Sequence, residues 1–114
     1  MLFRSVDITG SEQKELEHHL LEGRPFIFWA SLHFEDIDFD PKGGYGLSDG
    51  RYHRLFHGLH CMVCRGMDDS FYYLADPLNY NEKVEKETFM RIYRQLGRRA
   101  VVFLRRQEDS GAWQ

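Results

Sequence analysis

The amino-acid sequence predicts an α+β domain with a mainly antiparallel sheet of about four strands and two helices. Three observations lead to this fold class. The chain has 114 residues, which is the size of one domain with one core. Its hydrophobic share of 42% and charged share of 29% are typical of a globular protein. Short apolar runs alternate along the chain with two segments of helical periodicity. We assign the domain to residues 1–106 and a flexible tail to residues 107–114.

The first third of the chain predicts an extended segment, a helix and a strand. Residues 1–8 are expected to be extended. A helix follows, because Thr9 and Glu12 match the spacing of a capping box and Gly23 stands where a helix commonly ends in glycine. Residues 25–31 are apolar on both alternations, which is typical of a strand buried on both faces.

The second half of the chain predicts a β-hairpin, a helix and a closing strand. We expect hairpin strands at residues 60–67 and 71–75, with the second strand ending at Asp76-Pro77 because proline cannot continue a ladder. Apolar side chains at helical spacing then predict a helix that ends at Gly97. Residues 100–104 form the last predicted strand. The apolar members of the predicted helix are Phe89, Ile92, Tyr93 and Leu96.

The charge and the apolar runs exclude several classes of partner. A net charge of −3 gives no electrostatic basis for binding nucleic acid. The longest apolar run, residues 25–32, is far shorter than the roughly 20 residues of a membrane-spanning helix, so we expect no membrane partner. Nothing near the N-terminus resembles a signal peptide, and Cys61 and Cys64 make a poor disulfide framework. We therefore expect a cytoplasmic protein.

The segment of residues 33–58 predicts a long loop with two possible cation sites. Aspartates at alternate positions suggest calcium, but Pro41 and Leu47 stand where a calcium loop needs glycine and glutamate, so we favour a solvated acidic loop. The possible zinc ligands do not favour a shared site, because on the predicted strand Cys61 points away from both His60 and Cys64 and no second cysteine pair completes a tetrahedral site. We therefore expect neither metal nor cofactor. The aspartates are Asp36, Asp38 and Asp40, and the possible zinc ligands are His53, His57, His60, Cys61 and Cys64.

His60 and Asp76 are the candidate catalytic residues. His60 begins one strand of the predicted hairpin and Asp76 follows the other, so the turn brings both residues to the same end of the sheet. A carboxylate that orients an imidazole leaves the second ring nitrogen able to act as a base toward a nucleophile. A structural contact between a histidine and an aspartate is the alternative.

Three segments around these residues resemble papain-like cysteine peptidases of the bacteriocin-processing, double-glycine leader type. They are Gly23–Trp29, Leu59–Asp68 and Phe71–Pro77, and the later Ala100-Val101-Val102 resembles the end of the family's domain. Tyr93 stands near the family's usual tryptophan. The resemblance implies the sheet half of a papain-like fold, with His60 as general base and Asp76 as the acid that orients it.

The nucleophile of that family does not carry over to this chain. The resemblance implies a cysteine at the start of a helix in an N-terminal half, and we expect this chain to begin after that half. Cys61 and Cys64 should face opposite sides of their strand, and neither is placed to replace the missing thiol. Gln13 has no cysteine after it on its helix.

Three functions are therefore open. The chain is a peptidase-like domain without its own nucleophile, which binds a peptide or protein or needs a partner that supplies the thiol. Alternatively, it is a small interaction or inhibitor protein without catalytic ancestry, or a hydrolase that binds metal through its histidine-rich loop. The first reading predicts a homodimer or an obligate complex with another protein, because a half-domain exposes apolar surface, including parts of Phe26, Phe28 and Trp29.

Overall fold

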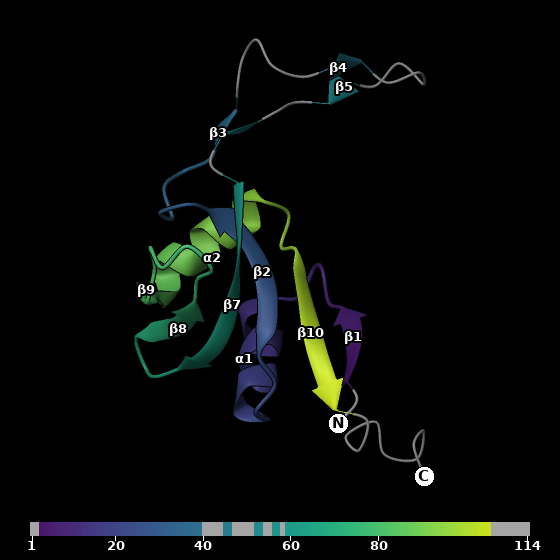
Figure 1. The fold of residues 1–114 in the computed structure, drawn as a ribbon, viewed down its shortest axis with the longest axis vertical. Helices are drawn as coiled ribbons and strands as arrows, with labels where there is room; N and C mark the ends of the chain where they lie inside the picture. Colours follow the sequence, from purple (N-terminus) through teal and green to yellow (C-terminus); the bar gives the residue numbers. More distant parts are fainter. Residues whose placement is uncertain (1–2, 40–44, 47–51, 54–55, 58, 106–114) are drawn as a thin grey trace.

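A computed structural model describes residues 3–39, 45–46, 52–53, 56–57 and 59–105 of the chain (Figure 1). The predicted tail at residues 107–114 lies outside this part. In chain order the elements are β1 (Phe3–Asp7), α1 (Gln13–Leu21), β2 (Phe26–Ser31), β3 (Asp38–Phe39), β4 (Tyr45–Gly46), β5 (Tyr52–His53), β6 (Phe56–His57), β7 (Leu59–Met67), β8 (Phe71–Ala75), β9 (Lys83–Glu85), α2 (Lys86–Gln95) and β10 (Ala100–Arg105).

Six of the strands form one antiparallel sheet in the order β1-β10-β2-β7-β8-β9. The predicted α+β class and the two helices are confirmed, but the expected number of about four strands is wrong. The extended N-terminal segment joins the sheet because β1 pairs with β10 along its whole length. The sequence analysis missed β9, which has three residues and buries only Val84, too short a pattern to show a period of two.

The predicted loop at residues 33–58 contains further strands. β3 pairs with β6 and β4 pairs with β5, each in a two-stranded antiparallel sheet. Figure 1 shows β3, β4 and β5 beyond the end of the main sheet at which β2 ends and β7 begins. Segments of two residues leave no apolar periodicity in the sequence, so the loop prediction was wrong over these strands for the same reason as for β9.

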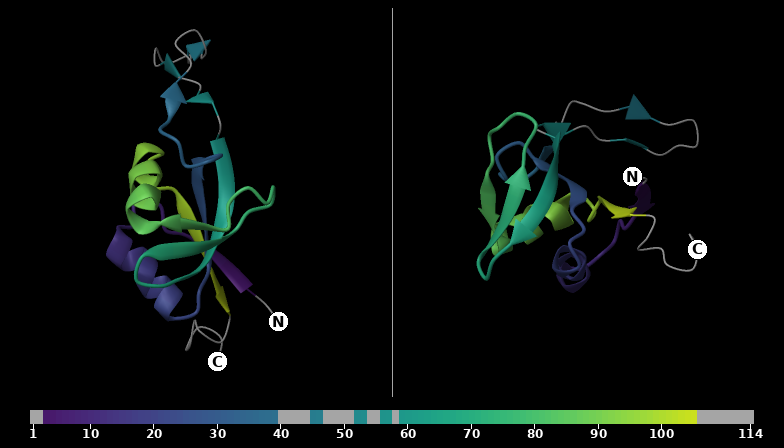
Figure 2. Two further views of the ribbon diagram at one scale, coloured as in Figure 1. Left: turned by 90° about the vertical axis from the view of Figure 1, so that its left-hand side faces the viewer. Right: turned by 60° about the horizontal axis from the view of Figure 1, so that its bottom comes forward.

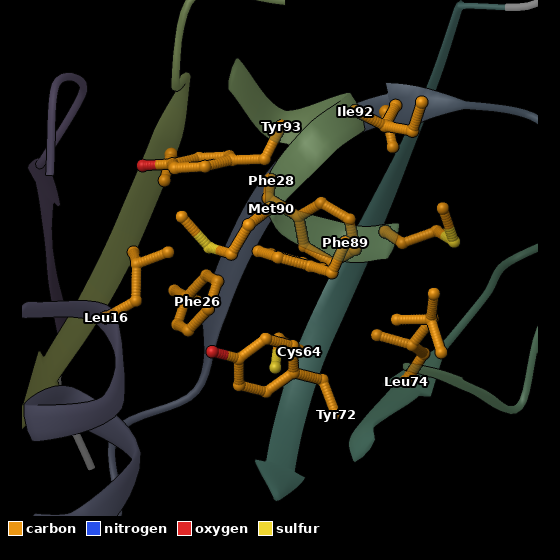
Figure 3. Close-up of a cluster of buried hydrophobic side chains, with 14 of the residues drawn as sticks. Leu16, Phe26, Phe28, Cys64, Tyr72, Leu74, Phe89, Met90, Ile92 and Tyr93 are labelled. Atoms are coloured by element: carbon orange, nitrogen blue, oxygen red, sulfur yellow. The ribbon is translucent and has the colours of Figure 1, made fainter. Parts of the chain in front are cut away.

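The core lies between the main sheet and the two helices, which both cover the same face of the sheet (Figure 2). Phe89 of α2 is at its centre, with ring centroids 4.6 Å from Phe28 and 4.7 Å from Tyr72 (Figure 3). Leu16 of α1 is also fully buried in this cluster. The aromatic residues therefore supply much of the buried apolar area that a short chain needs for a stable core.

The burial of β2 corrects two predictions. Phe26 and Phe28 have no exposed surface, because α1 and α2 cover their face of the sheet. The expectation that parts of both rings are exposed is therefore wrong. Ile27 and Trp29 point to the opposite face and are half-buried, so this strand is not fully buried on both sides.

The helix ends follow local capping rules with one change. α1 begins after Glu12, which caps the helix in a reciprocal pair with Glu15, rather than after Thr9 as the spacing predicted. Both predicted glycine ends are confirmed. Gly23 has a φ angle of +76° and Gly97 one of +83°, values that are costly for residues with a Cβ atom.

Candidate functional site

The hairpin of β7 and β8 brings His60 and Asp76 into contact. Nε2 of His60 lies 2.7 Å from Oδ1 of Asp76, so the hydrogen bond expected for such a pair is present. The His60 side chain is 11% exposed and that of Asp76 is fully buried. His60 pairs with Ala30 of β2, whose side chain lies on the sheet face that the helices cover. The side chain of His60 therefore lies on the same face. The pair therefore lies at one end of the sheet, at the border of the core.

The loop after β8 holds the carboxylate of Asp76. The backbone N–H of Leu78 donates to Oδ1 over 2.9 Å, which closes a turn over Pro77. Asn81 donates twice to Oδ2, from its backbone N–H over 3.0 Å and from its side-chain Nδ2 over 2.8 Å. Both carboxylate oxygens thus have two hydrogen-bond donors each.

The sequence analysis missed Asn81. The run of turn-forming residues after Asp76-Pro77 is a signal in the sequence, because it predicts an Asx turn at Asp76. This signal does not identify Asn81 as the partner. The contact from Asn81 spans five positions in a loop without repeating geometry. No periodicity in the sequence marks such a contact.

The surroundings of Asp76 keep its carboxyl group ionised. Burial raises the pKa of this group, but hydrogen bonds from His60, Leu78 and Asn81 act in the opposite direction and lower the pKa to about 2. A carboxylate without a proton only accepts hydrogen bonds, so Nε2 of His60 carries the hydrogen between the two groups.

The second ring nitrogen of His60 is left for chemistry. Within the described part of the chain, Nδ1 makes no hydrogen bond. With the hydrogen on Nε2, the neutral ring has its lone pair on Nδ1. An oriented imidazole with a free lone pair can take a proton from a thiol, a hydroxyl group or water.

Neither cysteine is placed or activated to serve as a nucleophile for His60. As predicted, the two thiols belong to opposite faces of β7: Cys64 is buried in the core and Cys61 pairs with Trp29 on the other face. Burial raises the pKa of the Cys64 thiol to about 12 and also raises the pKa of Cys61. Reactive cysteines have the opposite shift, because the thiolate is the nucleophile.

The other candidate residues do not join this pair. Asp36 accepts hydrogen bonds from Arg91 and Gln95 of α2. Gln13 donates to Glu17 and to the hydroxyl of Tyr72. Of the other residues proposed for calcium or zinc, Asp40 lies outside the described residues, and the structure describes only the backbone of Asp38, His53 and His57. Among the residues that the structure does describe, no three histidine, cysteine, aspartate or glutamate side chains are grouped as metal ligands would be. No helix in this part is long and apolar enough to cross a membrane.

A cavity of about 510 Å³ lies beside the loop after β8, and Asp76, Val63 and Ala75 are among its lining residues. Large apolar side chains are exposed at the same end of the sheet. Leu59 precedes His60 and is 51% exposed, and Tyr80 in the loop after Asp76 is 56% exposed. Exposed apolar groups next to a cavity are typical of surfaces that bind ligands or partners.

Residues 2–101 match the model of a family described as the Peptidase_C39-like family. The chain belongs to this family. Its resemblance to bacteriocin-processing peptidases, inferred from short motifs, is thereby confirmed. Uncharacterized protein YvpB of Bacillus subtilis is 27% identical over 97 residues, which are 84% of this chain and 38% of that protein.

A solved structure is similar in both sequence and fold. It is the crystal structure of a proposed C39-like peptidase from Bacillus anthracis, with a TM-score of 0.75 and 26% identity. The match covers 89% of this chain and 51% of the other. This C39-like chain thus spans about half, or less, of the length of the relatives that it matches.

Proposed function

We propose that this chain is the half of a papain-like thiol hydrolase site that carries the base, and that its nucleophile comes from a polypeptide segment outside the chain. One observation carries the proposal. His60 donates from Nε2 to a buried, ionised Asp76 and leaves Nδ1 without a partner in the described residues. Half of the Bacillus anthracis chain has no counterpart here, which leaves room for a second half that bears a thiol.

The proposed chemistry uses each group in a defined role. Nδ1 of His60 takes the proton of the incoming thiol, and the negative charge of Asp76 stabilises the imidazolium that results. The thiolate forms a bond to the carbonyl carbon of a peptide while the imidazolium returns its proton to the departing amine. Water then cleaves the thioester by the same base. In this scheme residues 1–114 are inactive alone and act only together with the segment that supplies the thiol.

A fusion protein tests this function. The unmatched half of the Bacillus anthracis relative, which the family resemblance implies to carry the cysteine, is joined ahead of Met1. The alkylation rate of its thiol by iodoacetamide is measured at pH 6 by mass spectrometry. We expect alkylation at least about tenfold faster than for an ordinary cysteine, because a paired imidazolium stabilises the thiolate.

The matched control variants decide the role of the pair. His60→Ala in the fusion should lower the alkylation rate to that of an unactivated thiol. His18→Ala removes an exposed histidine of α1 and should not change the rate. Equal rates in the parent fusion and the His60→Ala variant would contradict the proposal.

A second candidate function is peptide or protein binding without cleavage. It is supported by the cavity beside Asp76 and by exposed Leu59 and Tyr80 at the same end of the sheet. The fusion separates the two candidates. A binding module retains a bound peptide whole and leaves the donated thiol unactivated, whereas a hydrolase forms a thioester.

The proposed partner surface is the sheet face opposite the helices. Ile27, Trp29 and Val63 are apolar and half-buried there. An antiparallel sheet with one face in water usually has polar side chains on that face. We therefore propose that a second half, a second copy or another protein covers it, and that the complex forms in the cytoplasm.

A further inference from the structure

Asn81 connects three segments around the candidate site. Its Nδ2 group donates to Oδ2 of Asp76 over 2.8 Å and to the backbone carbonyl of Leu32 over 2.8 Å. The same nitrogen lies 3.6 Å from the sulfur of Met62 in β7. The side chain therefore connects the loop after β8 to the segment after β2, next to the carboxylate that contacts His60.

The orientation of the Asn81 amide follows from its neighbours. Both close oxygens, Oδ2 of Asp76 and the carbonyl of Leu32, accept hydrogen bonds and cannot donate. A reversed amide would place its own oxygen against these two acceptors. The two N–H bonds of Nδ2 thus have an oxygen partner each, and the sulfur of Met62 is a third, more distant acceptor.

This arrangement restricts the rotation of the Asp76 carboxylate. The last torsion angle of an aspartate side chain is soft and roughly two-fold, so an unsupported carboxylate samples a broad range of orientations. Asn81 holds Oδ2 with two donors and thereby leaves Oδ1 directed at Nε2 of His60. The orientation of the carboxylate selects the ring nitrogen that carries the hydrogen.

We infer that Asn81 is a positioning residue, which holds Asp76 so that His60 keeps its hydrogen on Nε2 and its lone pair on Nδ1. The use of this lone pair as a base depends on the proposed function. The control of the His60 tautomer by Asn81 does not depend on it. The effect of Asn81 on the tautomer can be measured in the chain alone.

The experiment is nitrogen-15 NMR of the histidine ring in the parent chain and in Asn81→Ala at pH 8. We expect a slowly exchanging Nε2–H and an unprotonated Nδ1 in the parent. Asn81→Ala should raise the exchange rate of this proton about tenfold and populate the other tautomer. Asn81→Asp, which places a third acceptor beside two others, should have a larger effect than Asn81→Ala.

A control in the same loop separates positioning from stability. Asn79 has a φ angle of 62°, and the hydrogen bond that it makes in the described part of the chain is from its backbone N–H to the carbonyl of Asp76, which glycine keeps. Asn79→Gly should therefore leave the His60 signals unchanged. A folded Asn81→Ala with the parent's tautomer and exchange rate would overturn the inference. If Asn81→Ala does not fold, Asn81→Leu, which keeps a side chain of similar size without a donor, is measured against the same two criteria.

The outcome is independent of the fusion experiment. A tautomer change in Asn81→Ala together with an unactivated thiol in the fusion supports the positioning role and contradicts the proposed hydrolase. An activated thiol with an unchanged tautomer contradicts the positioning role alone.

Discussion

Two polar clusters border the same core, and a comparison of them shows what distinguishes a site from a structural clamp. Each cluster contains a carboxylate that joins separate elements of the fold. The dyad cluster consists of His60, Asp76 and Asn81. The tyrosine cluster consists of Gln13, Glu17, Tyr72 and Lys86.

The contacts of the tyrosine cluster converge on one oxygen of Glu17. The hydroxyl of Tyr72 donates to Glu17 over 2.6 Å and accepts from Gln13 over 3.2 Å, and Lys86 pairs with Glu17 over 3.2 Å. Burial raises the pKa of Glu17, but the hydrogen bonds from Tyr72, Lys86 and Gln13 outweigh burial and lower it. These contacts join α1, β8 and α2 through Oε2 of Glu17 and the hydroxyl of Tyr72.

The dyad cluster differs in its imidazole ring. Asp76 has two donors on each carboxylate oxygen, whereas the contacts of Glu17 in the described part of the chain are all to Oε2. Both carboxyl groups have a lowered pKa, but Nδ1 of His60 has no hydrogen-bond partner in the described part of the chain. Burial, charge pairing and pKa shifts are therefore common to the two clusters. The unused lone pair on an oriented ring is what marks the dyad cluster as a candidate site.

The largest expected difference between the clusters is in stability. Asp76→Ala removes the acceptor of hydrogen bonds from His60, Leu78 and Asn81, and we expect a loss of about 3–5 kcal/mol in the free energy of unfolding. Glu17→Ala removes a carboxylate that is 23% exposed and should cost less, about 1–2 kcal/mol. Urea denaturation measures both. Equal losses would mean that the two carboxylates are equivalent in structure.

A smaller effect tests whether the clusters are independent. Tyr72→Phe deletes the hydroxyl that contacts Glu17 and Gln13, and we expect it to cost about 1–2 kcal/mol. The ring signals of His60 should not change, because the two clusters share no residue. Tyr73→Phe, which removes an exposed hydroxyl bonded to Asp68, is the control with nearly no effect. A shift of the His60 signals in Tyr72→Phe would show that the clusters are coupled.

The last expected effect is in the pH dependence of stability. The pKa of Asp76 is about 2 in the folded chain and about 3.9 in an unfolded one. Its contribution is therefore complete above about pH 4 and decreases as the pH falls toward about 2. The difference in stability between the parent and Asp76→Asn should be constant above about pH 4 and narrow below it.

Urea denaturation of both proteins between pH 2 and pH 6 measures this difference. The lowered pKa values of Asp7, Glu17 and Asp68 act in the same direction in both proteins and cancel in the comparison. A difference that stays constant down to pH 2 would contradict the ionised state assigned to Asp76.

The candidate pair could be predicted from sequence because its two residues belong to one hairpin. Residues 60–67 and 71–75 have clear strand patterns with a tight turn between them, so the antiparallel rule alone places His60 and Asp76 at the same end. The opposite orientation of Cys61 and Cys64 follows from the period of two in the same strand. Both inferences need only local geometry.

The parts that could not be predicted depend on contacts between distant segments. Asn81 reaches the carbonyl of Leu32 across 49 positions, and Phe26 and Phe28 are buried because Phe89 packs against them. The two alternations of β2 are both apolar, so the sequence does not say which face the helices cover. That choice is made by the packing of α1 and α2.

The sequence by itself determined the helices, the long strands, the hairpin and the pair of residues at its end, because periodicity and turn chemistry act over a few residues. Only the tertiary structure decided which sheet face is the core, that Asp76 is held by Asn81, and that Nδ1 of His60 is left without a partner among the described residues. The physical reason is that burial and hydrogen-bond saturation are sums over neighbours in space, and these neighbours are set by how the elements pack.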